Sequence, residues 1–151
     1  MPVCSQYGTM AERRRGRVTG IGGIFFKARD PKALVEWYRQ HLGIPIEDSV
    51  ALFTWRGGQE GKVQGHTVWS IFPKETKYFG DEGASFMINY RVADLDAVIA
   101  ALRTEGVKVA GKIEESEYGR FGWVVDPEGH RIELWEPPKE YSAPEKAIMM
   151  E

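Results

Sequence analysis

The sequence predicts an α+β fold built from two tandem β-α-β-β-β modules. Two stretches, "GHTVWSIFP" beginning at position 65 and "GHRIELWEP" beginning at position 129, share their first two residues and their last residue and lie 64 positions apart. The same offset relates Asp30 to Asp94, and each aspartate separates an extended segment from a helical pattern. Three shorter extended pieces follow the helical pattern in each half. A repeat of this kind indicates two copies of one structural unit.

Each module begins with a strand and a helix. The extended segments that start at Ile24 and Ile88 are rich in aromatic and β-branched residues, which favour strands. Asp30 and Asp94 are placed to cap the following helices, and glycine follows each helix where a helix end favours it. Apolar residues recur at three- and four-residue spacing, as one buried helix face requires; they are Leu34, Trp37, Tyr38 and Leu42, then Val98, Ala101 and Leu102.

The rest of each module is read as three strands, separated by glycine-rich or proline-rich turns. The predicted strands are 45–48, 50–56 and 66–72 in the first module and 107–113, 119–125 and 130–136 in the second. One helix covers only one face of the sheet in each module. We therefore expect the uncovered faces to curve together into a cup, with the helices on the outside.

Composition excludes several classes of protein. The formal net charge of −2 gives no support for nucleic acid or an anionic membrane as partner. Cys4 is the single cysteine, so neither an intrachain disulfide nor a thiolate metal cluster can form. No apolar run approaches the roughly 18 residues of a membrane helix, and the N-terminus lacks a secretory pattern. These observations predict a cytoplasmic protein.

The predicted domain organisation is one compact domain with short extensions. The divisions are a flexible leader at 1–17, one domain at 18–138 (module one 18–73, linker 74–83, module two 84–138) and a tail at 139–151.

The sequence resembles the vicinal oxygen chelate superfamily, which includes glyoxalase I, extradiol dioxygenases and the bleomycin and fosfomycin resistance proteins. The residues that carry the likeness are "FFKARDPKALVEWYRQHLGI", "YRVADLDAVIAALRTEGV" and "GWVVDPEGHRIELWEPP". The likeness extends over 18–138, and its most specific part is "DPEGHRIELWEP", because family members end in a similar strand. It implies a cupped, mostly antiparallel sheet and a homodimer.

In metal-dependent members of the superfamily, four side chains from the first and last strand of each repeat hold one divalent ion. The resemblance places Glu133 at the last of these positions, and the 64-residue offset then assigns the others to Gly23, Trp69 and Met87. Glycine has no side chain, indole has no usable lone pair and thioether is a soft donor. We therefore expect no metal ion and no other cofactor.

The histidines do not suggest a replacement metal site. His66 and His130 each lie three residues before Trp69 and Glu133, and odd spacing on a strand puts them on the opposite face from those residues. His41 lies near the end of the first helix, where a cation complements the helix dipole.

Alternation along the strands predicts which side chains line the cup. The candidate ligand-binding residues are Phe25, Trp69, Met87, Asn89, Arg91, Arg131, Glu133 and Trp135, and Lys27, Thr67 and Ile71 share their face. The opposite set is more apolar and is expected to pack under the helices: Ile24, Phe26, Val68, Phe72, Ile88, Tyr90, Val92, Ile132 and Leu134. Trp55, Phe121 and Trp123 are further candidate walls, and the segment 73–83, with Tyr78 and Phe79, is a candidate flap.

Three functional hypotheses follow from this face. The first is a metal-independent protein that binds an aromatic or amphipathic small molecule in the cup. The second is a lyase, isomerase or dioxygenase in which Glu133 acts as acid and base or as a remaining metal ligand. The third is a module that binds a partner chain.

Structural roles remain open for the same residues. Trp69 and Trp135 fit a core or a dimer interface as well as a binding wall, and Met87 fits a gap in the core. Glu133 can form an ion pair with Arg131, Arg91 or Lys27.

Overall fold

The computed structural model describes residues 17–139 except positions 58, 62 and 81–82. The expected flexible leader and the tail therefore lie, apart from one residue each, outside the described residues. Among the described residues, no helix has both the length and the apolar content that crossing a membrane requires.

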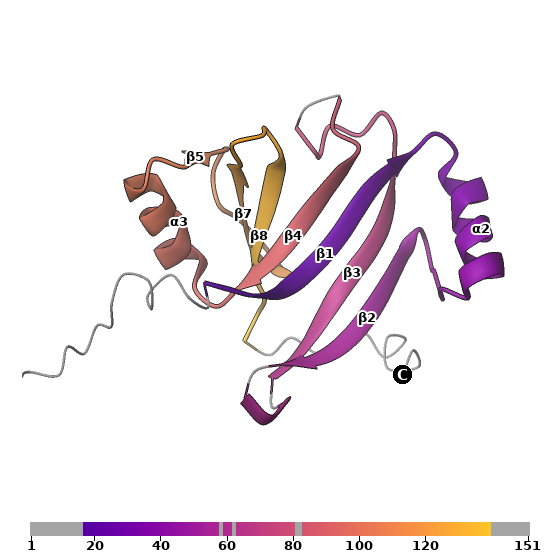
Figure 1. The fold of residues 1–151 in the computed structure, drawn as a ribbon, viewed down its shortest axis with the longest axis horizontal. Helices are drawn as coiled ribbons and strands as arrows, with labels where there is room; N and C mark the ends of the chain where they lie inside the picture. The colour runs from indigo at the N-terminus through magenta and orange to yellow at the C-terminus, as the bar shows by residue number, and fades with distance from the viewer. Residues whose placement is uncertain (1–16, 58, 62, 81–82, 140–151) are drawn as a thin grey trace, which may run out of the picture.

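The described strands form one mixed sheet in the order β2-β3-β1-β4-β8-β7-β5, with β6 also paired to β7 (Figure 1). Their bounds are β1 Val18–Ala28, β2 Val50–Gly57, β3 Val63–Pro73, β4 Phe86–Val92, β5 Lys108–Val109, β6 Glu114–Ser116, β7 Gly119–Val125 and β8 Arg131–Glu136. The two modules join where β1 and β4 pair antiparallel at the centre. Each of these strands also pairs in parallel with the last strand of its own module, β1 with β3 and β4 with β8. The predicted α+β fold with two modules is confirmed.

The two α-helices begin where the sequence predicts. Helix α2 spans Pro31–Leu42 and α3 spans Leu95–Thr104. Asp30 Oδ1 accepts a hydrogen bond from the Ala33 amide, and Asp94 Oδ1 accepts one from the Ala97 amide, each at 3.1 Å. These bonds satisfy amide groups that have no partner within the helix.

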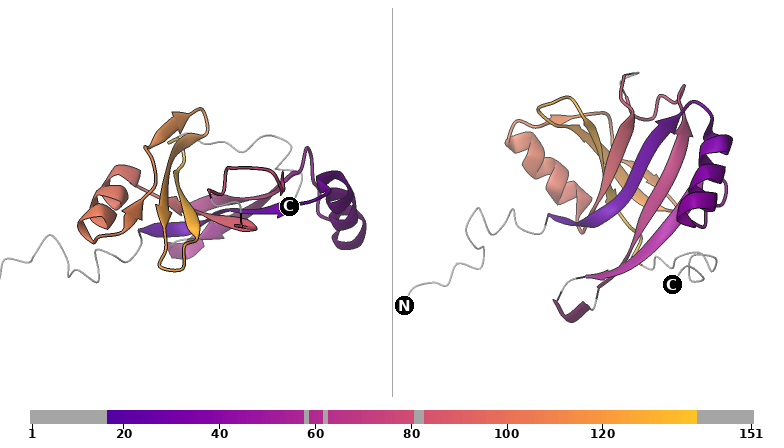
Figure 2. Two further views of the ribbon diagram at one scale, coloured as in Figure 1. Left: turned by 90° about the horizontal axis from the view of Figure 1, so that it is seen from above. Right: turned by 45° about the vertical axis from the view of Figure 1, so that its right-hand side comes forward.

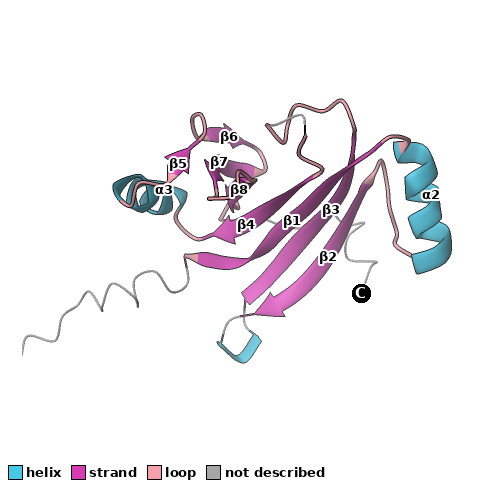
Figure 3. Cartoon of the chain, turned by 45° about the horizontal axis from the view of Figure 1, so that its top comes forward, coloured by secondary structure: helices cyan, strands magenta, loops and turns pink. Residues whose placement is uncertain are grey.

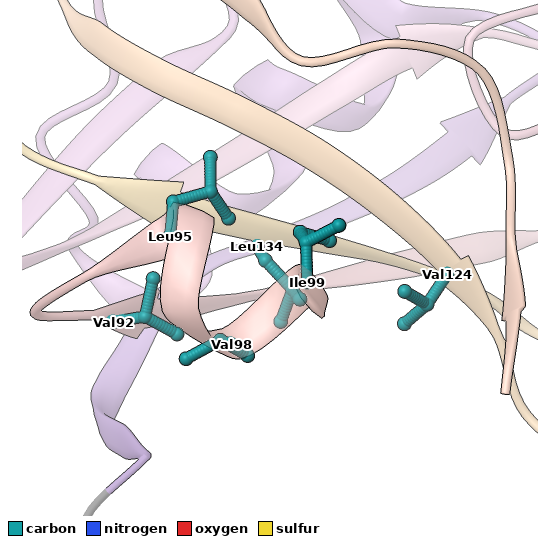
Figure 4. Packing of buried hydrophobic residues seen from close by; sticks show 6 residues of the cluster. All are labelled: Val92, Leu95, Val98, Ile99, Val124 and Leu134. Carbon is teal, nitrogen blue, oxygen red and sulfur yellow. The ribbon is translucent and has the colours of Figure 1, made fainter. Parts of the chain in front are cut away.

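Each helix packs an apolar face against the outer side of the sheet. Under α3 the buried cluster consists of Val92, Leu95, Val98, Ile99, Val124 and Leu134 (Figure 4). Under α2 it consists of Ala28, Val35, Ile46, Ala51 and Ile71. The helices lie at opposite ends of the sheet and leave the outer side of β1 and β4 between them (Figure 1).

The opposite face of the sheet is concave. In Figure 3 the strands β1, β2 and β3 are seen broadside, whereas β7 and β8 are seen nearly end on. Viewed from above, β7 and β8 rise out of the plane of the first module (Figure 2). We call this concave side the cup face.

Two predicted strands are wrong. Positions 45–48 contribute only an isolated bridge between Glu47 and Val50. Asp48 and Ser49 have φ angles of 47° and 67°, which turn the chain tightly and end pairing. The predicted strand 107–113 is reduced to the two residues of β5, since Gly111, with φ of 76°, breaks it before β6.

Candidate functional site

The cup face is lined mainly by aromatic and apolar side chains. Phe25, Phe79, Met87 and Trp123 form a buried cluster, against which Val68, Phe72 and Phe121 pack. Nearer the β8 C-terminus, Phe121 stacks on Trp135 with ring centres 6.4 Å apart and planes 14° apart. The sheet thus presents a wall of rings on the side that neither helix covers.

Glu133 lies in the middle of this wall and is 1% exposed. Its Oε1 accepts a hydrogen bond from Asn89 Nδ2 at 2.6 Å. Its Oε2 accepts one from Trp123 Nε1 at 2.9 Å and another from the hydroxyl of Tyr78. The donors are therefore an amide, an indole and a phenol, whereas the structural alternative expected an ion pair.

Burial and hydrogen bonding shift the pKa of Glu133 in opposite directions. Burial raises the pKa of Glu133, while the bonds from Tyr78, Asn89 and Trp123 and the charge of Arg131 oppose that rise. Burial and the nearby Glu133 also raise the pKa of Tyr78, so its hydroxyl stays protonated and donates. Arg131 lies over the Trp123 ring, 5.3 Å from the ring centre.

The prediction that Trp69 occupies the cup is wrong. In the parallel pairs, Asn89 lies opposite Glu133 and Phe25 lies opposite Ser70. Because the 64-residue offset that relates Asp30 to Asp94 makes Phe25 the repeat equivalent of Asn89, the equivalent of Glu133 is Ser70.

Trp69 instead packs under α2. Its ring centre lies 5.2 Å from that of Phe26 and 5.0 Å from that of Tyr38, both in edge-to-face contact. The sequence offset that relates β3 to β8 is one residue shorter than the 64 residues that separate the two matching stretches. A shift of one residue along a strand moves every side chain to the opposite face.

The same shift reverses other expectations for β3. Ile71 is buried under α2, whereas Val68 and Phe72 belong to the cup cluster. The Thr67 hydroxyl forms hydrogen bonds with two neighbouring strands: it accepts from Trp55 Nε1 on β2 at 3.0 Å and donates to the Ile21 carbonyl on β1 at 2.5 Å. His66 pairs with Thr54 on β2, and the expectation that it lies on the opposite face from Glu133 stays a prediction.

The other candidate ligand-binding residues lie where the alternation predicts. Phe25 and Met87 belong to the cup cluster, and Asn89 contacts Glu133 directly. Arg91, on the same face of β4, stacks its guanidinium 5.8 Å from the Trp55 ring centre and donates to the Gln64 carbonyl at 3.2 Å. Arg131 and Trp135 flank Glu133 on alternate positions of β8.

Two features of the site escaped sequence reasoning. The first is the bond from Tyr78 to Glu133, which joins residues 55 positions apart. The second is Gly22: a Cβ atom there would stand 2.2 Å from Asn89 Oδ1 and 3.0 Å from Trp135. Its absence leaves room for the Asn89 amide beside Glu133. The run "GIGG" that contains Gly22 was the available signal.

The donors at the four superfamily positions do not fit a metal centre. The positions are Gly23, Ser70, Met87 and Glu133, and both oxygens of Glu133 already accept hydrogen bonds. In the described part of the chain, no three His, Cys, Asp or Glu side chains stand together as a metal site would need. His66 Nδ1 lies 3.3 Å from Thr54 Oγ1. Burial, and to a smaller extent the positive charge of Arg91, lowers the pKa of His66.

Comparisons with known proteins agree with the fold. A family model described as a glyoxalase-like domain matches residues 23–135. No curated protein matches the sequence.

Several solved structures are similar. Methylmalonyl-CoA epimerase from Mycobacterium tuberculosis is 24% identical over 89% of this chain and 95% of its own, with a TM-score of 0.51. A methylmalonyl-CoA epimerase in complex with methylmalonyl-CoA and NH4+ is 22% identical over 83% and 99%, with a TM-score of 0.57. A structure described as NAD-dependent benzaldehyde dehydrogenase from Legionella pneumophila is 15% identical over 77% and 98%, with a TM-score of 0.52. At such identities the likeness shows the fold alone. Because the family model spans most of the sequence, the chain belongs to the glyoxalase-like domain family.

Proposed function

We propose that the chain is a metal-independent protein that binds an aromatic or amphipathic small molecule in the cup. The observation that carries this proposal is a pair of buried polar atoms on the aromatic cup face. Asn89 Oδ1 and Arg131 Nε have no hydrogen-bond partner among the described residues. Buried polar atoms are normally paired, and a few such groups in an apolar concavity are typical of a ligand site.

The geometry favours binding over proton transfer by Glu133. A general base must reach the proton that it removes, but Glu133 is almost completely buried, and both of its oxygens are engaged as long as Tyr78 donates to it. The rise in its pKa is the feature that a catalytic carboxyl would share. A ligand recovered unchanged after binding distinguishes the two functions.

Arg91 offers a place for the polar end of such a ligand. It lines a hollow of about 520 Å³ together with Trp55 and residues at the end of β8. Small-molecule sites have volumes of about 300–1,000 Å³. The hollow combines a cation and an indole ring, which suits an amphipathic molecule that has an anionic or polar group.

Replacing Arg131 by leucine is expected to weaken ligand binding about tenfold or more, because a buried charged donor is lost. The measurement is quenching of tryptophan fluorescence by a library of planar aromatic compounds, since Trp123 and Trp135 line the cup. Arg103→Leu, at an exposed site on α3, is the matched control and should bind as wild type does. Each binder is then recovered and weighed by mass spectrometry. Chemical conversion of the binder, or equal effects of the two variants, would contradict the proposal.

We also propose that the chain forms a homodimer through the outer face of β1 and β4. Ile21 and Ile24 on β1 and Phe86 on β4 are exposed, and both strands run between the two helices (Figure 1). Contiguous exposed apolar side chains of this kind are typical of protein interfaces. Ile24→Asp is expected to convert a dimer into a monomer in sedimentation velocity, whereas Leu42→Asp, at the exposed end of α2, should leave the dimer intact. A monomeric wild type would refute this arrangement.

A further inference from the structure

The side chain of Tyr78 occupies the rim of the cup in the manner of a bound phenol. Its ring stacks on Phe72 with centres 5.8 Å apart and planes 6° apart. It meets the Trp123 ring nearly at a right angle, with centres 6.4 Å apart. Its hydroxyl donates to Glu133 Oε2. A planar ring, two aromatic walls and one buried acceptor are together the elements of a recognition site.

We propose that this position is the binding site for a phenol-type ligand, meaning a planar aromatic ring that carries a hydroxyl or N–H donor. Tyr78 takes the place of that ligand until the ligand displaces it. The inference rests on the proposed function and names the ligand class of the same cup.

The contacts of Tyr78 allow its side chain to leave without the backbone. Tyr78 is 39% exposed, so its ring has a path to solvent. The segment is anchored by other groups: Phe79 is 1% exposed and lies beneath Lys27, whose Nζ stands 5.4 Å from the ring centre. A turn bond from the Gly80 amide to the Lys77 carbonyl, at 3.1 Å, closes the loop. Rotation of one side chain therefore opens the site.

The acceptor at the bottom of the site selects for a donor on the ligand. When Tyr78 leaves, Glu133 Oε2 keeps its bond from Trp123 Nε1 but loses the one from the phenol. A buried polar atom that loses a partner is costly. A ring with a hydroxyl or N–H group restores the bond, whereas a purely apolar ring of the same shape does not.

The test uses p-cresol, which is the tyrosine side chain as a free molecule, and toluene, which lacks the hydroxyl. Isothermal titration of the full chain should show that Tyr78→Ala binds p-cresol at least about tenfold more tightly than wild type, since one hydrogen bond and one stacked ring no longer compete. The same variant should prefer p-cresol to toluene about tenfold. Tyr118→Ala removes a side chain that is 61% exposed on the turn between β6 and β7 and keeps the backbone carbonyl that accepts a bond from Trp135 Nε1, so this variant should behave as wild type.

Each outcome decides the inference. No gain in p-cresol affinity in folded Tyr78→Ala would overturn it, while the general function, which is tested through Arg131 and a compound library, would stand. Equal binding of p-cresol and toluene would show a plain apolar cavity and overturn the ligand class. If Tyr78→Ala does not fold, Tyr78→Phe must bind p-cresol several-fold more tightly than wild type, and equal affinity would refute the inference. Failure of the general function would instead appear as no binding of any library compound to wild type or to the Tyr78 variants.

Discussion

The free energy of unfolding of the wild type, measured relative to that of Glu133→Gln, is expected to decrease as pH rises above about 4.5, which is the ordinary pKa of a glutamate carboxyl. Burial raises the pKa of Glu133 in the folded state, so the folded protein holds this proton more tightly than the unfolded chain does. The resulting stabilisation is fully present below the unfolded pKa and is lost as pH rises through the folded pKa. The slope between the two pKa values reaches about 1.4 kcal/mol per pH unit.

Urea unfolding at a series of pH values from acidic to mildly alkaline measures this effect. Glutamine cannot ionise, so the free energy of unfolding of Glu133→Gln should lack the decrease. Glu117→Gln, at an exposed turn, is the control and should follow wild type at every pH. A constant difference between wild type and Glu133→Gln across the series would show that the carboxyl titrates as an exposed one does.

Leu95→Ala is expected to lower the free energy of unfolding by about 2–5 kcal/mol, the range for leucine truncation in a packed core. Leu95 is 0% exposed and lies at the start of α3, where it packs with Ile99 and Leu134 (Figure 4). The substitution leaves a cavity that the strands behind the helix cannot easily close. Denaturant unfolding with two spectroscopic probes gives the difference.

Leu42→Ala provides the matched control for Leu95→Ala. Leu42 is 61% exposed at the end of α2, so the same change should alter the free energy of unfolding by less than about 0.5 kcal/mol. Comparable losses in the two variants would mean that the cluster under α3 does not hold the second module together.

The repeat in the sequence predicts most of the fold because each signal in it is local. Asp30 and Asp94 cap helices through bonds to amides three residues away. Alternation then places Asn89, Arg131 and Glu133 on the cup face, because β4 and β8 pair in regular register. These features depend on spacing within one strand or one helix turn.

The errors arise where the outcome depends on register or on distant contacts. Trp69 was assigned by matching letters, yet the offset between β3 and β8 is one residue shorter than the offset between β1 and β4. Ser70 is the position equivalent to Glu133. Val68 and Phe72, which share a strand face with Ser70, were assigned to the wrong face for the same reason. No spacing rule relates a tyrosine in a connecting segment to one carboxyl on a later strand, so the contact between Tyr78 and Glu133 requires the folded molecule.

Gly22, in the first module, affects how a carboxyl in the second module is held. It lies in the irregular part of β1, and the space of its missing side chain is filled by the Asn89 amide that orients Glu133. A methyl group at position 22 would therefore change a carboxyl that is encoded more than a hundred residues later. The sequences of two duplicated modules can diverge independently only at positions where the modules do not contact each other. At the β1–β4 contact, a change in one module limits which residues the other can carry.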